Sequence, residues 1–543
     1  MASSCGLRSA TTSPSSATKL PSKQSAVSSP AKPSNRRRQL SGAGLHNRDA
    51  ALGQLAGGAP ALVWREVVAD TETPVGAALK LIEPERGDFL LESVEGGEVR
   101  GRYSLLGLDP DLVFRARAEE GEINRLWQHD RAAFIPVDGR SLDALRALIE
   151  ECRIDVPDGL PPALACLVGY FAYETIGQVE VLPRAPESEL DLPDMVFTRP
   201  TLLLVFDSLT DNLFIIAPLW PSSGDPQAAI ERAGERIDHT LRCLASPDVS
   251  EVAADDFPEL NLTPRMAEDQ YSSMVAKAKE YITAGDIFQV VLAQRFTCPF
   301  PLPPLALYRA LRRVNPSPFL YFLDLPGFAV VGSSPEILVR LRDGEVTIRP
   351  IAGTRPRGAT PEADREAEAS LLADAKERAE HLMLLDLGRN DVGRVAAKGT
   401  VEVTDSFTVE RYSHVMHIVS NVVGQLDPAK DALDALFAGF PAGTVSGAPK
   451  IRACEIIAEL EPETRGPYAG GVGYFAPDGS FDSCIVLRTA VLKDGMMHVQ
   501  AGAGIVADSD PAYEQRECEA KAGALIAAAR EAARVASEPG FGQ

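Results

Sequence analysis

Apolar residues recur at helical spacing between positions 371 and 388. They are Leu371, Leu372, Ala375, Ala379, Leu382, Met383 and Leu387. This spacing predicts one helix with a single buried stripe, ending near Gly388. Glu377 and Glu380 lie beside the stripe. Glu377 is expected to be a solvated charge that pairs with nearby basic residues, and Glu380 either does the same or faces a site.

Short apolar runs separated by turns make up most of the remaining chain. Residues 89–93 and 102–107 predict two strands joined by a turn, 141–152 an amphipathic helix, and 163–173 and 201–216 buried strands. A helix over 266–283 precedes a strand at 286–294, and further strands are predicted within 315–322, 330–339, 347–353, 412–423, 470–475, 484–492 and 497–501. This pattern predicts an α+β fold of largely antiparallel sheets covered by helices.

The N-terminal segment differs in composition from the rest of the chain. Residues 1–48 contain no Asp or Glu, are rich in Ser and Thr, and carry recurring basic residues. This composition predicts a disordered extension over 1–55 that resembles an organelle transit peptide. Its first residues fit a plastid address better than a mitochondrial one, and a disordered bacterial extension is the alternative. We therefore expect a plastid protein in the first case and a cytoplasmic one in the second.

An acidic, proline-bearing stretch over 246–264 predicts a connector within the globular part. It separates an N-terminal part, 62–245, from a C-terminal part, 265–528, that carries most of the candidate chemistry. With 543 residues, 45% of them hydrophobic, the chain can bury a large core as one large or two intertwined domains.

Charge and cysteine content exclude several classes of function. The net charge of -22 argues against nucleic acid or an anionic membrane as a partner, so an anionic substrate would need a local cationic pocket. No apolar run is long enough to cross a bilayer. The 8 cysteines are scattered without paired spacing, which predicts reduced thiols rather than a disulfide frame or a zinc site.

The last predicted helix carries a second set of candidate carboxylates. It begins after Ser509-Asp510-Pro511, a cap followed by proline, and it places Glu514, Glu517 and Lys521 on one face. Glu517 and Lys521 are either a surface pair or part of a site. If this face looks inward, Glu380 and Glu517 together can hold one Mg²⁺, which needs few protein carboxylates.

Other candidate residues point to an acid or base and to an anion site. The strand over 412–420 places His414 and His417 on opposite faces, so one of them is expected to be buried, as a core histidine or as an acid or base. Lys450, Tyr468 and Arg488 would form a carboxylate clamp if they surround one cavity. The glycines at 470–473 and 502–504 lack a nucleotide-binding pattern and are either simple turns or places where backbone N–H groups approach a carboxylate.

Four motifs together resemble a known family. They are Pro-Ile-Ala-Gly-Thr-Arg-Pro-Arg-Gly at 350–358, Glu-His-Leu-Met-Leu at 380–384, Gly-Thr-Val-Ser-Gly-Ala-Pro-Lys at 443–450 and Gly-Ala-Gly-Ile-Val at 502–506. Over roughly residues 62–528 the chain resembles the chorismate-utilising enzymes, and most closely the large subunits of anthranilate synthases. The resemblance implies a two-layered sandwich of largely antiparallel sheets flanked by helices.

The resemblance also implies roles for individual residues. Glu380 and Glu517 match the family's magnesium ligands, Glu336 matches the general acid, and His417 matches the histidine of the later pyruvate elimination. The residues that match substrate-binding positions of the family are Gly353, Thr354, Tyr468, Arg488, Gly502, Ala503, Gly504 and Lys521. Lys450, from the carboxylate clamp, is also expected to bind substrate. Thr354 is expected to have a catalytic role as well.

The implied reaction converts chorismate and ammonia into anthranilate and pyruvate with Mg²⁺ as cofactor. Gln289 stands where water-adding relatives carry lysine, and Ala352 stands where aminodeoxychorismate synthases usually carry lysine. The chain contains no Gly-x-Cys-x-Gly nucleophile elbow, so ammonia is expected from solution or from a separate glutamine amidotransferase subunit. An aminodeoxychorismate synthase is the alternative enzyme.

A further set of residues resembles the tryptophan feedback site of the family. It comprises Glu92, Ser93, Arg102, Tyr103, Asn315, Pro316, Pro318, Phe319 and Leu320. Phe319-Leu320 departs from the commoner Tyr-Met pair. A catalytically silent tryptophan-binding subunit is the remaining alternative, and the joint presence of Glu336, Glu380, His417 and Glu517 argues against it.

Overall fold

Two long strands that pair with each other connect the two arms of the sheet. The structure, a computed structural model, describes residues 44–95, 99–221, 224–246, 259–412 and 415–537. Strands β5 (Tyr103–Arg117) and β9 (Met195–Asp207) pair antiparallel from Tyr103↔Asp207 to Ala116↔Met195, with a register shift between Pro110 and Leu112. Every position of β9 is buried, as its nearly continuous apolar sequence predicts.

A first arm of sheet extends from one end of this pair. Its strands follow the order β1 (Ala61–Val68), β10 (Asn212–Leu219), β9, β5, β2 (Asp88–Glu92), β13 (Phe319–Leu325), β14 (Phe328–Ser334), β23 (Thr489–Lys493), β24 (Met496–Ile505) and β12 (Gln289–Pro299). Short strands β11 (Thr263–Pro264) and β20 (Gly447–Ala448) pair with β12. β2 and β5 form the hairpin-like pair that the sequence predicts.

A second arm extends from the other end of β9. Its order is β8 (Leu167–Phe171), β21 (Gly471–Phe475), β22 (Phe481–Ile485), β15 (Ile337–Arg342), β16 (Glu345–Ile348) and β19 (Val415–Gln425), with β17 (Ile351–Pro356) and β18 (Glu402–Arg411) both paired to β19. Strands β6 (Glu120–Asn124) and β7 (Ile135–Pro136) continue from β5, and β3 (Val94–Glu95) pairs with β4 (Val99–Arg100). Every pairing among the described strands is antiparallel, as the sequence predicts.

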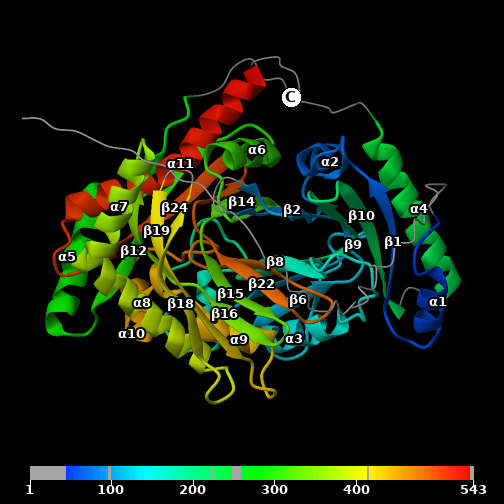
Figure 1. Ribbon diagram of the computed structural model, residues 1–543, viewed down its shortest axis with the longest axis horizontal. Coiled ribbons are helices and arrows are strands. Elements are labelled where there is room, and N and C mark those ends of the chain that lie inside the picture. The colour runs from blue at the N-terminus through cyan, green and yellow to red at the C-terminus, as the bar shows by residue number, and fades with distance from the viewer. Residues whose placement is uncertain (1–43, 96–98, 222–223, 247–258, 413–414, 538–543) are drawn as a thin grey trace, which may run out of the picture. The chain divides into compact units, whose positions relative to one another are not determined.

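Helices cover the sheets. They are α1 (Arg48–Ala56), α2 (Pro74–Leu81), α3 (Ser141–Glu151), α4 (Pro226–Leu244), α5 (Glu268–Ala284), α6 (Pro304–Val314), α7 (Pro361–Ala373), α8 (Ala375–Gly393), α9 (Ala432–Gly439), α10 (Lys450–Leu460) and α11 (Pro511–Ser537). The C-terminal α11 packs on β24, α5 and α6 (Figure 1), whereas α8 packs on β17 and β19. No helix in the described ranges has both the length and the apolar content that a membrane span requires.

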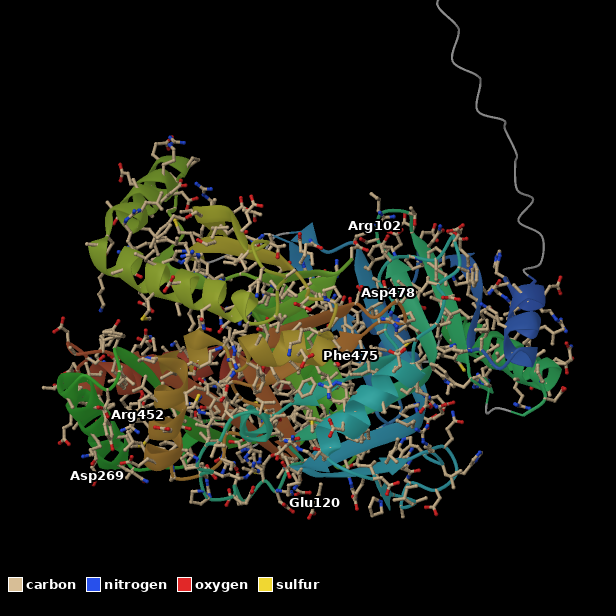
Figure 2. The ribbon with its side chains drawn as sticks, turned by 90° about the horizontal axis from the view of Figure 1, so that it is seen from below. Arg102, Glu120, Asp269, Arg452, Phe475 and Asp478 are labelled. Carbon is tan, nitrogen blue, oxygen red and sulfur yellow. The ribbon has the colours of Figure 1, made fainter. Side chains whose placement is uncertain are left out.

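Aromatic rings fill the junction between β9 and the second arm. The ring centroids of Phe171 and Phe197 lie 4.9 Å apart, and Phe475, which is labelled in Figure 2, stacks on Phe481 at 4.5 Å. Such pairs stabilise a core by about 0.5–1.5 kcal/mol beyond the burial of their area. The second arm is therefore held against the long strands by packing as well as by backbone hydrogen bonds.

The predicted helix over 371–388 is wrong in two respects. It is two helices, because Asp374 ends α7 and its carboxylate caps α8, accepting hydrogen bonds from the backbone N–H groups of Lys376 (2.9 Å) and Glu377 (3.3 Å). The break changes the helical phase, so Leu382, expected in the stripe, is 57% exposed. α8 instead buries His381, Leu384, Leu385 and Gly388, and it continues to Gly393.

Two other boundaries also differ from the prediction. The single strand expected over 201–216 is the pair β9 and β10, because residues 208–211 turn the chain and Asp211 adopts a positive φ of 54°. Folded structure begins earlier than residue 62, since α1 starts at Arg48, inside the segment 1–55 that is expected to be disordered. Residues 1–43, which make up most of the segment predicted to resemble a transit peptide, lie outside the described residues, and so does His414.

The N-terminal and C-terminal parts share their sheets. β2 pairs with β13, and β8 pairs with β21, so strands from before and after the predicted connector are joined once in each arm. Residues from Gly44 onward accordingly form one unit. The seven cysteines in the described ranges carry free thiols.

Candidate active site

A cavity of about 700 Å³ lies where the ends of the two arms meet α8 and α11. Its walls come from β12, β24, β17 and β19, from these two helices, and from the turns that precede β15 and β23. It is lined by most of the predicted site residues: Glu336, Gly353, Thr354, Glu380, His417, Tyr468, Arg488, Gly502, Gly504, Glu517 and Lys521. Residues that are far apart in the chain therefore converge on one site.

Lys450 and Ala503 are not among the residues that line the cavity. The Lys450 ammonium is buried and donates hydrogen bonds to the Asp391 carboxylate at 2.9 Å and to the Gly439 carbonyl at 3.2 Å. Asp391 is itself buried in α8, and an unpaired charge there would cost several kcal/mol, so Lys450 serves as its counter-charge. Ala503 pairs with Leu292 on β12 and is fully buried. The expected substrate contact of Lys450 is therefore wrong.

Carboxylates from two helices meet in this cavity. Glu380 comes from α8, and Glu517 comes from α11, where it lies 2.7 Å from the Lys521 ammonium. The pKa of Glu380 is raised, chiefly by burial and then by the negative charges of Glu377 and Glu517. The face of α11 that bears Glu517 and Lys521 thus borders the cavity, and the two side chains also form the predicted i, i+4 pair.

These carboxylates fit a divalent cation. A cation would remove both the burial cost and the mutual repulsion that raise the pKa of Glu380. No group of three or more His, Cys, Asp or Glu side chains in the described residues is arranged to hold a metal alone. A hard cation here would therefore take some of its oxygen ligands from water and substrate, as Mg²⁺ usually does.

Two further carboxylates, one from each of these helices, line the cavity. Burial, followed by the charge of Glu517, raises the pKa of Glu514. Glu377 accepts a hydrogen bond from Arg355 at 3.0 Å and is thereby neutralised. The sequence pattern places Glu514 on the correct face, whereas it suggests only a surface role for Glu377, because the break at Asp374 is not apparent from the spacing.

Glu336 stands on the short connection between β14 and β15, where it is buried against the cavity. Burial raises the pKa of its carboxyl to about 8, outweighing the opposite effects of the Thr444 hydroxyl and the Ile351 N–H. The group is therefore protonated near neutral pH. A buried, protonated carboxyl at a cavity wall can act as a general acid.

His417 has the arrangement of a general base. Its Nδ1 lies 3.0 Å from the Gly353 carbonyl and 3.1 Å from the Thr354 hydroxyl. Donation from Nδ1–H to the carbonyl assigns the tautomer and leaves the Nε2 lone pair free. Burial lowers the pKa of His417 against the opposing effect of the hydrogen bond to Gly353, and the positive charge of Arg488 lowers it further, so the neutral imidazole is favoured. Gly353 adopts φ +70° at a register shift in β17, which directs its carbonyl toward His417.

Arg488 and Tyr468 supply the polar groups for an anionic ligand. The Arg488 guanidinium has no carboxylate partner among the described residues, and burial lowers its pKa. Its backbone φ of +48° lies in the left-handed region, a strain that is characteristic of functional sites. A Cβ at Gly502 would lie 2.9 Å from the Tyr468 hydroxyl oxygen, so glycine is needed for the close approach of β24. The cavity therefore contains the local cationic group that an acidic protein needs to bind an anion.

A second cavity, of about 400 Å³, contains most of the expected feedback residues. Glu92, Ser93, Arg102, Tyr103, Phe319 and Leu320 line it, and Arg102, labelled in Figure 2, is bound to Asp207 at 2.8 Å. Asn315, Pro316 and Pro318 are not among its lining residues. The lining also includes Arg340, Arg342 and Asp482, which belong to the second arm and carry no signal in the local sequence.

Comparisons with known proteins agree with this arrangement. A family model described as chorismate binding enzyme matches residues 89–527. Anthranilate synthase component 1 of Cereibacter sphaeroides is 55% identical over 89% of this chain and 97% of its own, and that of Pseudomonas putida is 46% identical over 83% and 92%. The crystal structure of anthranilate synthase component I from Streptococcus pneumoniae matches with a TM-score of 0.71, 35% identity, and coverage of 85% of this chain and 98% of that one.

A more distant match supports the fold alone. MenF, the menaquinone-specific isochorismate synthase of Escherichia coli, is 21% identical, with a TM-score of 0.63 over 89% of this chain and 99% of its own. The predicted α+β fold class is confirmed. These relatives are bacterial, and they give no support to the plastid address predicted from composition. By the extent and identity of these matches, the chain belongs to the chorismate-binding enzymes and, within them, to the anthranilate synthase component 1 family.

Proposed function

We propose that the protein converts chorismate and ammonia into anthranilate and pyruvate in a Mg²⁺-dependent reaction. The observation that carries the proposal is the convergence in one cavity of a protonated carboxyl (Glu336), a neutral histidine with a free Nε2 (His417), and the Glu380 and Glu517 carboxylates. These are the acid, the base and the cation ligands that such a reaction needs.

The first step adds ammonia to the ring. Arg488 and Tyr468 bind and orient a substrate carboxylate, which the guanidinium can do without breaking an existing ion pair among the described residues. Glu336 donates its proton to the C4 hydroxyl, so that the C4–O bond breaks and water leaves while the ammonia nitrogen bonds to C2 and releases a proton. A Mg²⁺ held by Glu380 and Glu517 would stabilise negative charge on the substrate carboxylate.

The second step makes the ring aromatic. Nε2 of His417 accepts the proton from C2, and the bond between the ring and the enolpyruvyl oxygen breaks. The side chain departs as the enolate of pyruvate, which becomes pyruvate when its methylene carbon takes up a proton. The hydrogen bond from Nδ1–H to the Gly353 carbonyl holds the ring in place and stabilises the imidazolium that forms.

Two cavity residues favour anthranilate over the related products. Gln289 and Ala352 both line the cavity at positions where lysines are expected in water-adding relatives and in aminodeoxychorismate synthases, respectively. Neither side chain can act as the basic group that a lysine supplies.

Ammonia is proposed to come from a separate glutamine amidotransferase subunit, because the chain lacks a glutaminase nucleophile motif. The second cavity is proposed to bind tryptophan as a feedback inhibitor.

The direct test uses the purified chain with chorismate, ammonium and Mg²⁺. We expect anthranilate, detected by its fluorescence, no product when glutamine replaces ammonium, and loss of the product when EDTA removes the metal. Formation of 4-aminobenzoate after addition of aminodeoxychorismate lyase would instead establish the alternative enzyme. Absence of any product from folded protein would refute the proposed chemistry.

Glu380→Gln tests the cation site. Loss of one charged ligand should lower kcat by at least about 100-fold, because several kcal/mol of charge stabilisation depend on the bound metal. The matched control is Asp386→Asn, which removes a carboxylate from the exposed side of the same helix. Circular dichroism should show both variants folded, and wild-type turnover by Glu380→Gln would exclude Glu380 from the site.

The pKa of Glu336 predicts a pH limit on catalysis. Since its carboxyl must be protonated to act as an acid, and its pKa is about 8, kcat/KM should fall as the pH rises through about 8. Glu336→Gln should lower kcat by about 100-fold or more and remove this descending limb of the pH profile. A variant that keeps the limb would assign it to another group.

Ser93→Phe tests the second cavity. A phenyl ring should occupy space that the inhibitor needs and raise the tryptophan concentration for half-inhibition at least about tenfold. Turnover without tryptophan should stay within about twofold of wild type, because Ser93 does not line the catalytic cavity. Ser208→Phe, an exposed serine outside the lining, is the control. Unchanged inhibition in Ser93→Phe would place the regulatory site elsewhere.

A further inference from the structure

His381 follows Glu380 directly on α8, yet the proposed chemistry does not use it. The imidazole is fully buried, and its Nε2 lies 2.6 Å from the Ser420 hydroxyl oxygen. Its Nδ1 has no hydrogen-bond partner among the described residues. The one side-chain hydrogen bond that the structure shows for this buried ring is therefore the contact with Ser420.

Ser420 connects this histidine to two strands. It lies on β19, three positions after His417, and its hydroxyl oxygen also accepts a hydrogen bond from the Phe407 backbone N–H at 3.1 Å. Phe407 belongs to β18, the neighbouring strand. One hydroxyl thus joins α8, β18 and β19.

Phe407 is held in a strained conformation. Its φ of +53° is rare for a bulky residue, and it lies at a register shift between Asp405 and Thr408. Such strain costs about 1–3 kcal/mol and persists only where the surroundings enforce it. The bulge brings the Phe407 ring to 4.7 Å from the His381 ring, edge to face, with the Arg378 guanidinium 4.8 Å from the Phe407 ring centroid. Two residues of α8, His381 and Arg378, therefore contact the Phe407 ring.

The arrangement determines where the neighbouring site residues point. Successive residues of a helix are turned by about 100°, so seating His381 against Ser420 directs Glu380 to a different side, and Glu380 lines the cavity. Side chains alternate along a strand, so Ser420 and His417 face opposite sides of β19. The interior contact between His381 and Ser420 consequently sets the positions of two groups that face the cavity.

Core packing alone does not account for this histidine. A leucine would fill a similar volume without leaving a buried ring nitrogen unpaired, which costs about 1–3 kcal/mol. The hydrogen bond between His381 and Ser420 depends on direction, whereas apolar packing does not. A displacement or rotation of α8 on β19 would therefore break it.

We propose that His381, Ser420 and the Phe407 bulge form a positioning lock that fixes α8 on β19 and thereby sets the placement of Glu380 relative to His417. His381 is a positioning residue in this arrangement, since it touches neither substrate nor metal in the proposed reaction. The kinetic consequences rest on the proposed function, whereas the geometric consequence does not.

The test compares four variants with wild type. His381→Leu removes the hydrogen bond and keeps apolar volume, Ser420→Ala removes its partner, the double variant tests coupling, and His381→Gln supplies an amide that can reach Ser420. A misplacement of about 1 Å can cost about 100-fold in rate, so each of the first two should lower kcat about 10-fold to 100-fold with little change in the chorismate KM. The double variant should be no worse than the poorer single variant, and His381→Gln should recover part of kcat.

Val392→Ala is the matched control. Val392 is fully buried on the same helix, so the substitution should lower Tm through a core cavity while leaving kcat close to wild type. If His381→Leu and Ser420→Ala behave like this control, with a lower Tm and unchanged kcat, the lock has only a structural role and the proposal is overturned.

Crystal structures of wild type, His381→Leu and Ser420→Ala separate the lock from the proposed function. The separation between the Glu380 carboxylate and the His417 Nε2 should change by about 1 Å in the variants. An unchanged separation refutes the lock, whatever the activity. A changed separation supports it even if the wild-type protein makes no anthranilate, in which case only the proposed function fails.

Discussion

Carboxylates repel one another when burial removes the water between them, and this repulsion is the constraint on which the cavity depends. Burial and the charges of Glu377 and Glu517 raise the pKa of Glu380 together. The protein limits the repulsion by pairing Glu377 with Arg355 and Glu517 with Lys521, while Glu380 accepts no hydrogen bond or ion pair that we observe in the described residues. A cation would complete this charge balance more fully than a protein side chain can, because it would meet both helices at once.

Local structure follows from the sequence wherever a segment carries its own signals. The helix α3, the helix α5 and the antiparallel pair β2 and β5 are predicted closely, because amphipathic spacing and turn residues determine them locally. The errors arise where one side chain overrides the pattern. Asp374 caps a new helix and changes the phase of the buried stripe, and the turn at 208–211 divides one apolar run into two strands.

The site required more than local pattern. Spacing alone leaves Glu380 and Glu517 as a cation pair only on the condition that the last helix faces inward, and the resemblance to a family is what assigns them as magnesium ligands. Lys450 shows why residue type is insufficient, since its ammonium neutralises the buried Asp391 instead of facing the cavity. Arg340, Arg342 and Asp482 enter the second cavity from strands that sequence distance does not connect to Glu92 or Phe319. Such neighbours follow from strand order, which is a property of the whole sheet.

The pairing of early strands with late ones has a consequence for biosynthesis. β2 finds its partner β13, and β8 its partner β21, only after most of the chain has left the ribosome. Until then, the backbone N–H and C=O groups along these strand edges have no native partner, and such edges are prone to pair with other chains. Folding therefore relies on long-range contacts that form late, which slows it relative to a protein built from local hairpins. Synthesis of this chain should accordingly place a heavy demand on chaperones that shield nascent β-strands.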